Sequence, residues 1–287
     1  MTATIIDGKA TAATLKEELR ERVQALTQHG VTPGLATVLI GDDPGSHVYV
    51  RNKHRAAADL GIDSFRYDLP ADTTREQALE LIAGLNADPK VDRYLIQYPV
   101  PPQLDYSELV TAMGPEKDAD GLHPTNLGYL ALGAPAHPRP GTPLAIVELL
   151  TRYQIPIEGR HVVIVGRGVT VGRGLAMLLS LKEPHANATV TQCHTGTNFL
   201  PEYTHRADIL VSGAGRPGLI TADMVRPGAA VIDVGISRSE TGIAGDVAPD
   251  VVDVAGWLAP VPGGVGPMTI AMLLRSTVEG AEARAAV

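Results

Sequence analysis

Tyr49 and Lys53 stand four residues apart in this 287-residue chain, and their side chains could do chemistry together. They lie in residues 47–60, a stretch free of Gly and Pro that follows an apolar run over residues 35–40. We predict a buried strand, a loop and a helix, with Ser46 as the helix N-cap. Positions i and i+4 share a helix face, so a phenol and an ammonium group would meet near a strand-to-helix loop, where α/β enzymes often place functional groups. Ordinary solvated helices also carry such pairs by chance.

The apolar pattern predicts alternating strands and helices along the whole chain. In the first half we expect helices over residues 10–29, 47–60, 73–87 and 106–113 and strands over 35–40, 62–69 and 94–97. A loop-rich stretch over 114–141 follows, and its end, 133–141, is the best linker candidate. In the second half we expect helices over 143–153, 175–181 and 268–281 and strands over 161–166, 188–193, 208–212 and 229–234. This order favours mostly parallel sheets covered by helices.

A glycine-rich turn, Gly166-Arg-Gly-Val-Thr-Val-Gly172, separates a predicted strand from a predicted helix. Such a turn points backbone N–H groups and a helix N-terminus at an anion, as in dinucleotide-binding proteins. Its glycine spacing differs from G-x-G-x-x-G, so the indication comes from the strand-to-helix context, and a plain turn is the alternative.

The strand after this turn ends in Cys193-His-Thr-Gly-Thr197 and lacks the acid that usually holds a ribose 2′-hydroxyl. Arg167 lies inside the glycine turn, where it could pair with a 2′-phosphate. We therefore expect NADP rather than NAD, with Thr195 and Thr197 as hydrogen-bonding partners of the phosphate.

Composition excludes several classes of protein. The net charge of −8 and the absence of a long basic run argue against nucleic acid as the main partner. Arg160, Arg167 and Arg173 form a group of positive charges that could serve an anionic ligand. The single cysteine, Cys193, cannot form an intramolecular disulfide. We expect a cytoplasmic protein, because neither a secretory signal nor a bilayer-length apolar stretch is evident.

Five motifs occur in a fixed order along the chain. They are Pro44-Gly-Ser-His-Val-Tyr-Val-Arg-Asn-Lys53, Gln97-Tyr-Pro99, Lys117-Asp-Ala-Asp-Gly-Leu-His123, Val165-Gly-Arg-Gly-Val-Thr-Val-Gly172 and Pro262-Gly-Gly-Val-Gly-Pro-Met-Thr269. Together they resemble the bifunctional methylenetetrahydrofolate dehydrogenase/methenyltetrahydrofolate cyclohydrolase family. The resemblance spans nearly the whole chain, from Asp7-Gly-Lys9 to the last predicted helix. The third and fifth motifs are highly specific in combination, whereas the glycine-rich turn is not.

The resemblance implies an α/β fold of two domains. An N-terminal αβ catalytic domain would comprise residues 1–139 and 268–287, with the last helix returning to it, and a Rossmann-type dinucleotide-binding domain would comprise residues 140–267. Folate would bind in the cleft between them. The implied reactions are NADP-dependent oxidation of 5,10-methylenetetrahydrofolate to 5,10-methenyltetrahydrofolate and hydrolysis of the latter to 10-formyltetrahydrofolate. These belong to one-carbon metabolism and purine biosynthesis, here in a homodimer, and no metal is expected.

The resemblance also implies roles for individual residues. Lys53 matches the catalytic lysine, Tyr49 the tyrosine beside it and Gln97 the glutamine that contacts and tunes it. The residues that match the folate site are Asp120, which holds the pterin ring, and Ser46, Tyr98, Pro262 and Gly263. The residues that match the cofactor site are Gly166, Arg167, Gly168, Val171, Gly172, Thr195 and Ile236.

The chain departs from the family pattern at five positions. Gly168 stands where the family usually has Ser, Gly174 where it has Pro, Gly141 where it has Cys, Tyr98 where it has Leu and Gly196 where it has Lys. Gly168 and Gly196 each remove a potential phosphate contact and so weaken the case for NADP. Tyr98 and Gly141 lie near the expected folate site, where they could alter substrate affinity.

Four alternative functions are compatible with parts of this pattern. In a short-chain dehydrogenase the nucleotide turn should precede the tyrosine, but here it follows Tyr49. A shikimate-type or amino-acid dehydrogenase shares the domain order but not the third and fifth motifs. A binding protein without turnover is disfavoured by the intact Tyr49, Lys53, Gln97 and Asp120. A monofunctional methylenetetrahydrofolate dehydrogenase is the remaining alternative, although such relatives tend to lose the lysine-centred set.

Overall fold

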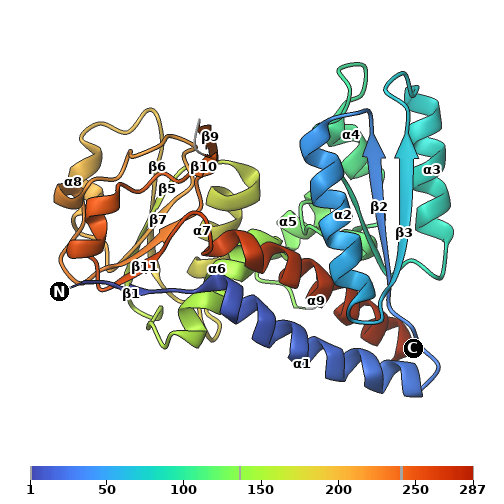
Figure 1. Ribbon diagram of the computed structural model, residues 1–287, viewed down its shortest axis with the longest axis horizontal. Coiled ribbons are helices and arrows are strands. Elements are labelled where there is room, and N and C mark those ends of the chain that lie inside the picture. The colour runs from blue at the N-terminus through green and yellow to red at the C-terminus, as the bar shows by residue number, and fades with distance from the viewer. Residues whose placement is uncertain (1, 136, 240–241, 287) are drawn as a thin grey trace. The chain divides into compact units, whose positions relative to one another are not determined.

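The computed structural model describes residues 2–135, 137–239 and 242–286, and the chain divides into two compact units. The glycine-loop unit contains the residues up to Ala13 and Thr142–Thr269, and the lysine unit contains Thr14–Gly141 and the residues from Ile270 onward. Two long helices, α1 (Gly8–Gln28) and α9 (Val265–Ala285), begin in the former and continue in the latter (Figure 1). By its contacts the segment up to Ala13 groups with the glycine-loop unit, and the predicted bounds of the catalytic domain, residues 1–139 and 268–287, stay a prediction.

The glycine-loop unit is built on a six-stranded parallel sheet (Figure 1). Its strands, in spatial order, are β1 (Thr4–Ile5), β11 (Trp257–Ala259), β8 (Ala230–Asp233), β7 (Ile209–Ser212), β5 (His161–Val165) and β6 (Thr189–Cys193). The helices of this unit include α6 (Gly141–Arg152), α7 (Gly174–Ser180) and α8 (Leu200–Thr204). The chain leaves β5 toward β6 on one side and continues to β7 on the other, which makes the β5–β7 junction a topological switch point.

All four strands predicted for this unit are confirmed, but its short strands were missed. β1 and β11 have too few residues to show a period, and a hairpin of β9 (Ser237–Ser239) and β10 (Gly242–Ala244) was also not predicted.

The Asp7-Gly-Lys9 segment and the Pro262 motif meet at the start of α1. The Gly8 N–H donates to the Gly263 carbonyl at 2.9 Å, and a Cβ on Gly8 would lie 1.7 Å from the Gly264 oxygen. Only glycine at position 8 therefore permits this contact.

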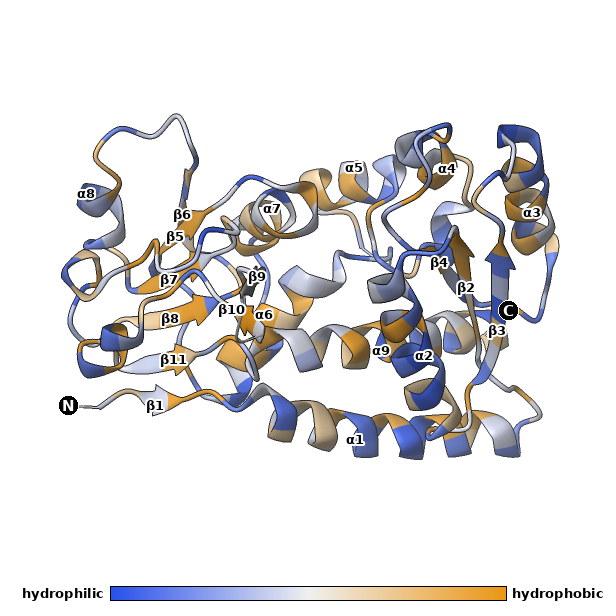
Figure 2. Cartoon of the chain, turned by 45° about the horizontal axis from the view of Figure 1, so that its top comes forward, coloured by the Kyte–Doolittle hydropathy of each residue, from blue (hydrophilic) through white to orange (hydrophobic). Residues whose placement is uncertain are grey.

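The lysine unit contains a three-stranded parallel sheet with β2 (Gly34–Ile40) between β3 (Asp63–Leu69) and β4 (Arg93–Ile96). The helices that follow these strands are α2 (Pro44–Ala58), α3 (Arg75–Ala87) and α4 (Tyr106–Thr111). β2 is buried along its whole length, as expected for a central strand covered on both faces. Figure 2 shows the corresponding hydrophobic colouring on β2 and on the central strands of the other sheet.

Part of the predicted loop over residues 114–141 is helical. Helix α5 runs over Pro124–Leu132, with the His123 Nδ1 accepting a hydrogen bond from the Thr125 N–H at 3.0 Å. Gly133 ends the helix in the left-handed conformation, with φ of 65°. The Pro and Gly that indicated a loop are therefore the first residue and the terminator of a helix, which are positions that favour these residues.

The start of α2 also differs from the prediction, because Asp43 and not Ser46 caps the helix. The Asp43 Oδ2 accepts hydrogen bonds from the Ser46 N–H at 2.7 Å and from the Ser46 hydroxyl at 2.8 Å. Pro44 occupies the first helical position, where its missing N–H has no cost. Gly61, with φ of 79°, follows the end of the helix as expected.

Helix α9 packs on the lysine unit, which confirms that the last helix returns to the first domain. Glu282 accepts two hydrogen bonds from Arg22 of α1, at 2.9 and 2.6 Å, and Arg284 pairs with the buried Asp92 beside β4 at 2.7 Å. Apolar residues of α9 such as Leu274 and Val278 are fully buried, so their packing stabilises this arrangement more than a partly exposed ion pair.

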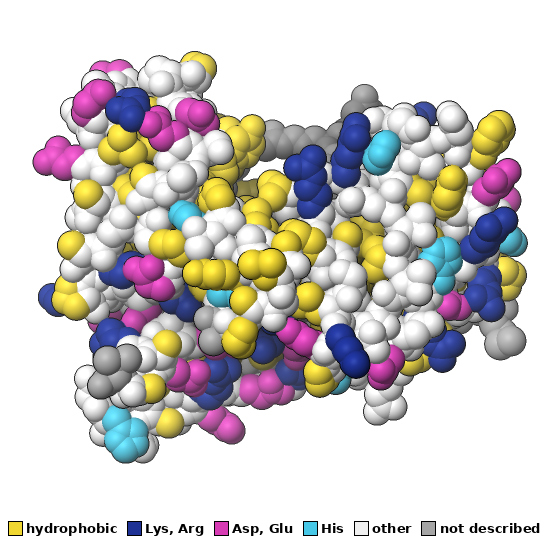
Figure 3. All heavy atoms as spheres, turned by 180° about the vertical axis from the view of Figure 1, so that it is seen from behind, with side chains coloured by type: hydrophobic (Ala, Val, Ile, Leu, Met, Phe, Trp, Pro, Cys, Tyr) yellow, Lys and Arg dark blue, Asp and Glu magenta, His cyan; other side chains and the backbone are white. Residues whose placement is uncertain are grey.

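Lys and Arg side chains are scattered over the face in Figure 3 and lie among Asp and Glu in several places. None of the helices in the described part of the chain is both long and apolar enough to cross a membrane.

Candidate active site

Lys53 and Gln97 meet in the lysine unit, a contact that the family resemblance implies. Lys53 is on α2, and its Nζ donates a hydrogen bond to the Gln97 Oε1 at 3.0 Å. Gln97 directly follows β4, and its backbone N–H donates to the Val38 carbonyl of β2 at 2.8 Å. Its side-chain Nε2 donates to the Tyr98 carbonyl at 2.9 Å, so the amide oxygen is directed at the lysine. The pair therefore lies at the carboxyl edge of the sheet, where α/β proteins bind their ligands.

The neighbour of Lys53 in the chain, His54, fixes α2 against the sheet. One ring nitrogen, Nε2, lies 2.7 Å from the Thr37 hydroxyl of β2, and the other, Nδ1, lies 2.8 Å from the Ser64 hydroxyl of β3. Burial lowers the pKa of His54, and the positive charges of Arg66 and Lys53 lower it further. A neutral ring satisfies both contacts, because each hydroxyl can donate or accept.

Asp120 acts electrostatically on Lys53. Burial lowers the pKa of Lys53, and the charge of Asp120 opposes this shift. Burial also raises the pKa of Asp120, while the charge of Lys53 lowers it and that of Asp118 raises it. Burial thus favours the neutral form of each group, and their mutual attraction favours the charged forms. The site holds a lysine that loses its proton more readily than an exposed one.

Asp118, two residues earlier, organises the loop that carries Asp120. It is 2% exposed, and its carboxylate accepts hydrogen bonds from the Gly121 N–H at 3.0 Å and from the His123 N–H at 2.7 Å. Gly121 has φ of 69°, and a Cβ there would lie 2.2 Å from the Arg139 carbonyl carbon. The sequence prediction did not assign this role, although the spacing of the two aspartates in the Lys117 motif was a signal for it.

Three tyrosines belong to the same region. Tyr49 is 49% exposed on α2, and Tyr98 is 64% exposed directly after Gln97. The ring of Tyr98 meets that of Tyr106 edge to face, with centroids 5.3 Å apart. This contact places Tyr106, a residue that the sequence analysis did not predict, near the site, and burial, with the charges of Asp120 and Asp118, raises its pKa. Ser46 is buried in the helix cap, and its contact with a substrate stays a prediction.

The glycine-rich turn follows β5 in the other unit and leads through a π-helical turn, Val169–Arg173, into α7. A Cβ on Gly172 would lie 2.2 Å from the Gly166 oxygen, and one on Gly166 would lie 2.6 Å from the Gly213 oxygen. A Cβ on Gly168 would meet nothing within 4 Å. Close backbone approach therefore requires two of the three glycines, while the third has room for a side chain.

A cavity of about 500 Å³ opens at this turn, at the carboxyl edge of the sheet. Of the predicted cofactor residues, Gly166, Arg167, Gly168 and Thr195 line it, together with Thr197. It is also lined by residues that sequence reasoning missed, among them His194, Ala214 and Arg216. None of the described residues that line the cavity is acidic. Two arginines, a histidine and two hydroxyls therefore suit an anionic ligand such as a dinucleotide phosphate.

The three other predicted cofactor residues do not line this cavity. Gly172 lies beneath the turn, and the Val171 side chain packs 3.4 Å from where a Cβ on Gly213 would stand. Ile236 is 57% exposed.

His194, which lines the cavity, has a fixed ring orientation, because its Nδ1 accepts a hydrogen bond from the Gly196 N–H at 3.0 Å. The neutral ring therefore carries its proton on Nε2, which is a donor available to a ligand.

A buried carboxylate, Asp246, holds the segment over residues 213–216 that borders the cavity. Its Oδ2 accepts from the Ser212 hydroxyl at 2.9 Å and from the Ala214 N–H at 2.6 Å, and its Oδ1 accepts from the Arg216 N–H at 2.7 Å. The neighbouring Asp233 accepts from the Asp246 N–H at 2.9 Å, and burial raises its pKa to about 6. This segment directly follows β7, which is parallel to β5. Residues that follow parallel strands lie at the same edge of the sheet, so the sequence could have indicated this segment as part of the site.

The predicted group of three arginines is not brought together. Arg167 lines the cavity after β5, but Arg160 precedes β5 and lines a different pocket at the amino end of the strand. Five strand residues separate the two positions. The prediction was wrong because the two arginines flank an extended strand. They are close in sequence, but the full length of β5 separates them in space.

Known protein families match both halves of the chain. Residues 6–120 match the tetrahydrofolate dehydrogenase/cyclohydrolase catalytic domain, and residues 140–285 match the NAD(P)-binding domain of the same family. The structure is similar to that of a bifunctional methylenetetrahydrofolate dehydrogenase/cyclohydrolase from Campylobacter jejuni, with 43% identity, a TM-score of 0.95 and coverage of 98% of this chain and 99% of that one.

Two further solved structures are similar over their full length. One is a 5,10-methylenetetrahydrofolate dehydrogenase from the silkworm Bombyx mori, with 43% identity, a TM-score of 0.94 and coverage of 99% of this chain and 100% of that one. The other is a methylenetetrahydrofolate dehydrogenase-cyclohydrolase from Trypanosoma brucei, with 37% identity, a TM-score of 0.93 and coverage of 100% of both chains, in complex with NADP and an inhibitor. With both domains matched and these identities over nearly its whole length, the chain belongs to the tetrahydrofolate dehydrogenase/cyclohydrolase family.

Proposed function

We propose that this protein oxidises 5,10-methylenetetrahydrofolate to 5,10-methenyltetrahydrofolate with NADP and hydrolyses the product to 10-formyltetrahydrofolate. The observation that carries the proposal is the Lys53–Gln97 contact at 3.0 Å under the charge of Asp120. A lysine used only for solubility would be exposed and would keep its ordinary pKa. A partly buried lysine with an oriented partner is typical of a catalytic group.

Hydride transfer requires no strong side-chain base. The folate nitrogens supply the electron push, so the protein mainly positions the two reacting rings. NADP supplies the hydride acceptor when bound. Arg167, His194 and Thr195 would hold its 2′-phosphate, and the backbone over residues 166–168 would approach its pyrophosphate.

Hydrolysis requires proton movement, for which Lys53 is suited. Water adds to the carbon between the two folate nitrogens, and the bond from that carbon to N5 then breaks to leave the formyl group on N10. The Lys53 amine accepts one proton of the attacking water and passes it to N5. The second proton leaves the oxygen for solvent as the C–N5 bond breaks and the formyl C=O forms, so the cationic methenyl compound gives a neutral product and one proton. Its lowered pKa increases the fraction of free amine near neutrality, and Gln97 holds Nζ in place. Tyr49, on the same helix face, would border the reacting group.

Replacing Asp120 with alanine should weaken folate binding by about 1–3 kcal/mol, because the amino-pyrimidinone edge of the pterin would lose its acceptor. The same change should move the pH profile of hydrolysis to lower pH, since the charge of Asp120 raises the pKa of Lys53. Equilibrium titration with a tetrahydrofolate analogue measures the first effect. The matched variant Asp120→Asn keeps the size and removes the charge. Unchanged folate affinity in both variants would remove Asp120 from the site.

We expect a higher kcat/KM with NADP than with NAD. Arg167→Gln should lower kcat/KM for NADP by about tenfold to a hundredfold, the value of a charge-assisted hydrogen bond, and should change the NAD value little. Initial-rate kinetics with both nucleotides measure this. Arg173→Gln is the matched control, because Arg173 lies in the same loop but does not line the cavity. Equal or reversed preference in the wild-type protein would contradict the assignment.

We further propose that the protein is a cytoplasmic homodimer whose product serves purine biosynthesis, as the family resemblance implies. Ser46, Tyr98, Pro262 and Gly263 are proposed to contact the folate on the same ground. The alternatives are a dehydrogenase without cyclohydrolase activity and a paralogue that binds without full turnover. The retained Lys53–Gln97 contact disfavours both.

A further inference from the structure

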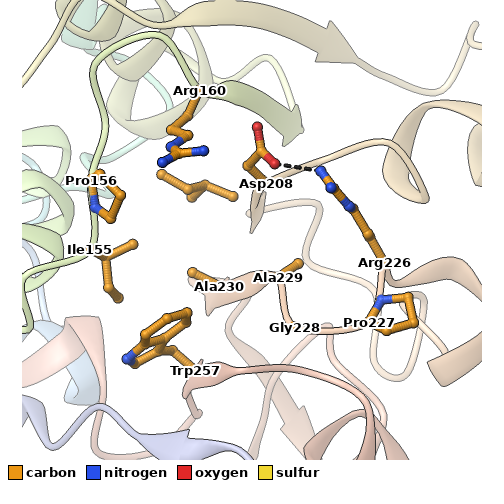
Figure 4. Close-up of a pocket in the computed structure, with 11 residues that line it drawn as sticks. Ile155, Pro156, Arg160, Asp208, Arg226, Pro227, Gly228, Ala229, Ala230 and Trp257 are labelled. Carbon is orange, nitrogen blue, oxygen red and sulfur yellow. Dashed lines mark hydrogen bonds and ion pairs between the residues drawn. The ribbon is translucent and has the colours of Figure 1, made fainter.

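A second pocket lies in the glycine-loop unit at the amino ends of its strands. It has a volume of about 240 Å³ and is lined by Arg160 before β5, Asp208 before β7, Ala230 at the start of β8 and Trp257 at the start of β11 (Figure 4). The glycine-rich turn is at the opposite, carboxyl end of these parallel strands. The dinucleotide site therefore does not account for this pocket.

Asp208, the acidic residue among the described residues that line the pocket, is already engaged. The Asp208 Oδ1 accepts a hydrogen bond from the Arg226 Nη1 at 2.5 Å, and its Oδ2 accepts one from the His161 N–H at 2.9 Å. Figure 4 shows Arg226 extended toward this carboxylate. The two charges compensate one another, so the remaining charge of the pocket is positive.

That positive charge is Arg160. Its guanidinium makes no hydrogen bond or ion pair with any residue in the described part of the chain. Its backbone is fixed on both sides, since its N–H donates to the Ile157 carbonyl at 3.0 Å and its carbonyl accepts from the Thr189 N–H at 2.9 Å. In Figure 4 the guanidinium faces the interior of the pocket. A ligand would thus meet an exposed cation on an anchored backbone and would not have to displace a partner from it.

Rings and aliphatic side chains form much of the remaining lining, together with backbone. The Trp257 indole lies across the pocket from Arg160, and the rings of Pro156 and Pro227 stand at its two sides (Figure 4). An indole and two prolines offer contact area to a planar group at little cost in conformational entropy. The volume is below the roughly 300–1,000 Å³ of pockets for drug-sized ligands, so the occupant must be small.

We propose that this pocket binds a small planar organic carboxylate. The fork of N–H groups on Arg160 matches the two carboxylate oxygens, and the ring of the ligand packs between the Trp257 indole and the prolines. This binding is separate from the folate and dinucleotide chemistry and does not depend on it.

Trp257 is the only tryptophan of the chain, so indole fluorescence reports directly on the pocket. We expect 4-methylbenzoate to change this fluorescence in a saturable way in the full-length protein. 4-Methylbenzamide, which has the same shape without the charge, should bind about tenfold more weakly. Saturating NADP should not displace 4-methylbenzoate, since the dinucleotide cavity is at the other end of the strands.

Arg160→Gln should reduce the affinity for 4-methylbenzoate to that for the amide and leave dehydrogenase activity unchanged, because the side chain is exposed and has no partner to lose. Lys182→Gln, which removes an exposed positive charge elsewhere in the same unit, should bind like the wild type. The proposal is overturned if no saturable change occurs, if acid and amide bind equally, if Arg160→Gln binds normally or if NADP competes.

Discussion

Replacing Lys53 with alanine should lower the rate of methenyltetrahydrofolate hydrolysis by about 10²- to 10⁴-fold, the usual contribution of a general acid–base group. The variant loses the Nζ that contacts Gln97, and Gln97 itself has no proton-transfer group of suitable pKa to replace it. Oxidation of the methylene compound should be much less affected, because hydride transfer depends on the alignment of two rings. Loss of methenyl absorbance, measured without nucleotide, reports hydrolysis alone.

Arg51→Ala is the matched control for this variant, since Arg51 is an exposed cation on the same helix. It should hydrolyse the methenyl compound at close to the wild-type rate. Lys53→Ala with normal hydrolysis would show that the lysine is not the catalytic group, whereas equal loss in both variants would point to general destabilisation of α2.

Gly172→Ala should raise the KM for NADP by about tenfold to a hundredfold, the cost of forcing atoms into a filled space. Its Cβ would stand 2.2 Å from the Gly166 oxygen and 3.0 Å from the Arg167 Cα, so the turn has to move. The movement displaces the residues that line the cavity. Hydrolysis measured without nucleotide should be retained, because Lys53 belongs to the other unit.

Gly168→Ala is the matched substitution in the same turn. Its φ is −64° and its Cβ would meet nothing within 4 Å, so the KM for NADP should stay near the wild-type value. The same space would accommodate a serine side chain at this position. Similar KM values for the two alanine variants would contradict the assignment of the turn to the cofactor.

The sequence was sufficient where local pattern and strand order decide the structure. Fully buried strands such as β5 and β7 appear as continuous apolar runs, and their helices alternate with them. The meeting of Lys53 and Gln97 was implied by the family resemblance and not by the pattern, and it agrees with the strand order, because a helix after β2 starts at the edge where β4 ends.

The sequence was insufficient where long-range contacts decide. Asp43 and Ser46 are both good N-caps, and only the path of the chain after β2 selects Asp43. Pro124 and Gly133 are as compatible with a loop as with the two ends of α5. Asp246 follows β10 in sequence, and its contact with residues 214–216 exists only once the sheet has formed.

The most direct test of the account is an absorbance assay with methylenetetrahydrofolate and NADP that follows NADPH and the methenyl compound separately. In the wild-type protein NADPH should form while the methenyl compound stays low, because hydrolysis consumes it. In Lys53→Ala the NADPH should still form, and the methenyl compound should accumulate in equal amount. Accumulation of the methenyl compound in the wild-type protein, or absence of NADPH, would contradict a bifunctional enzyme centred on Lys53.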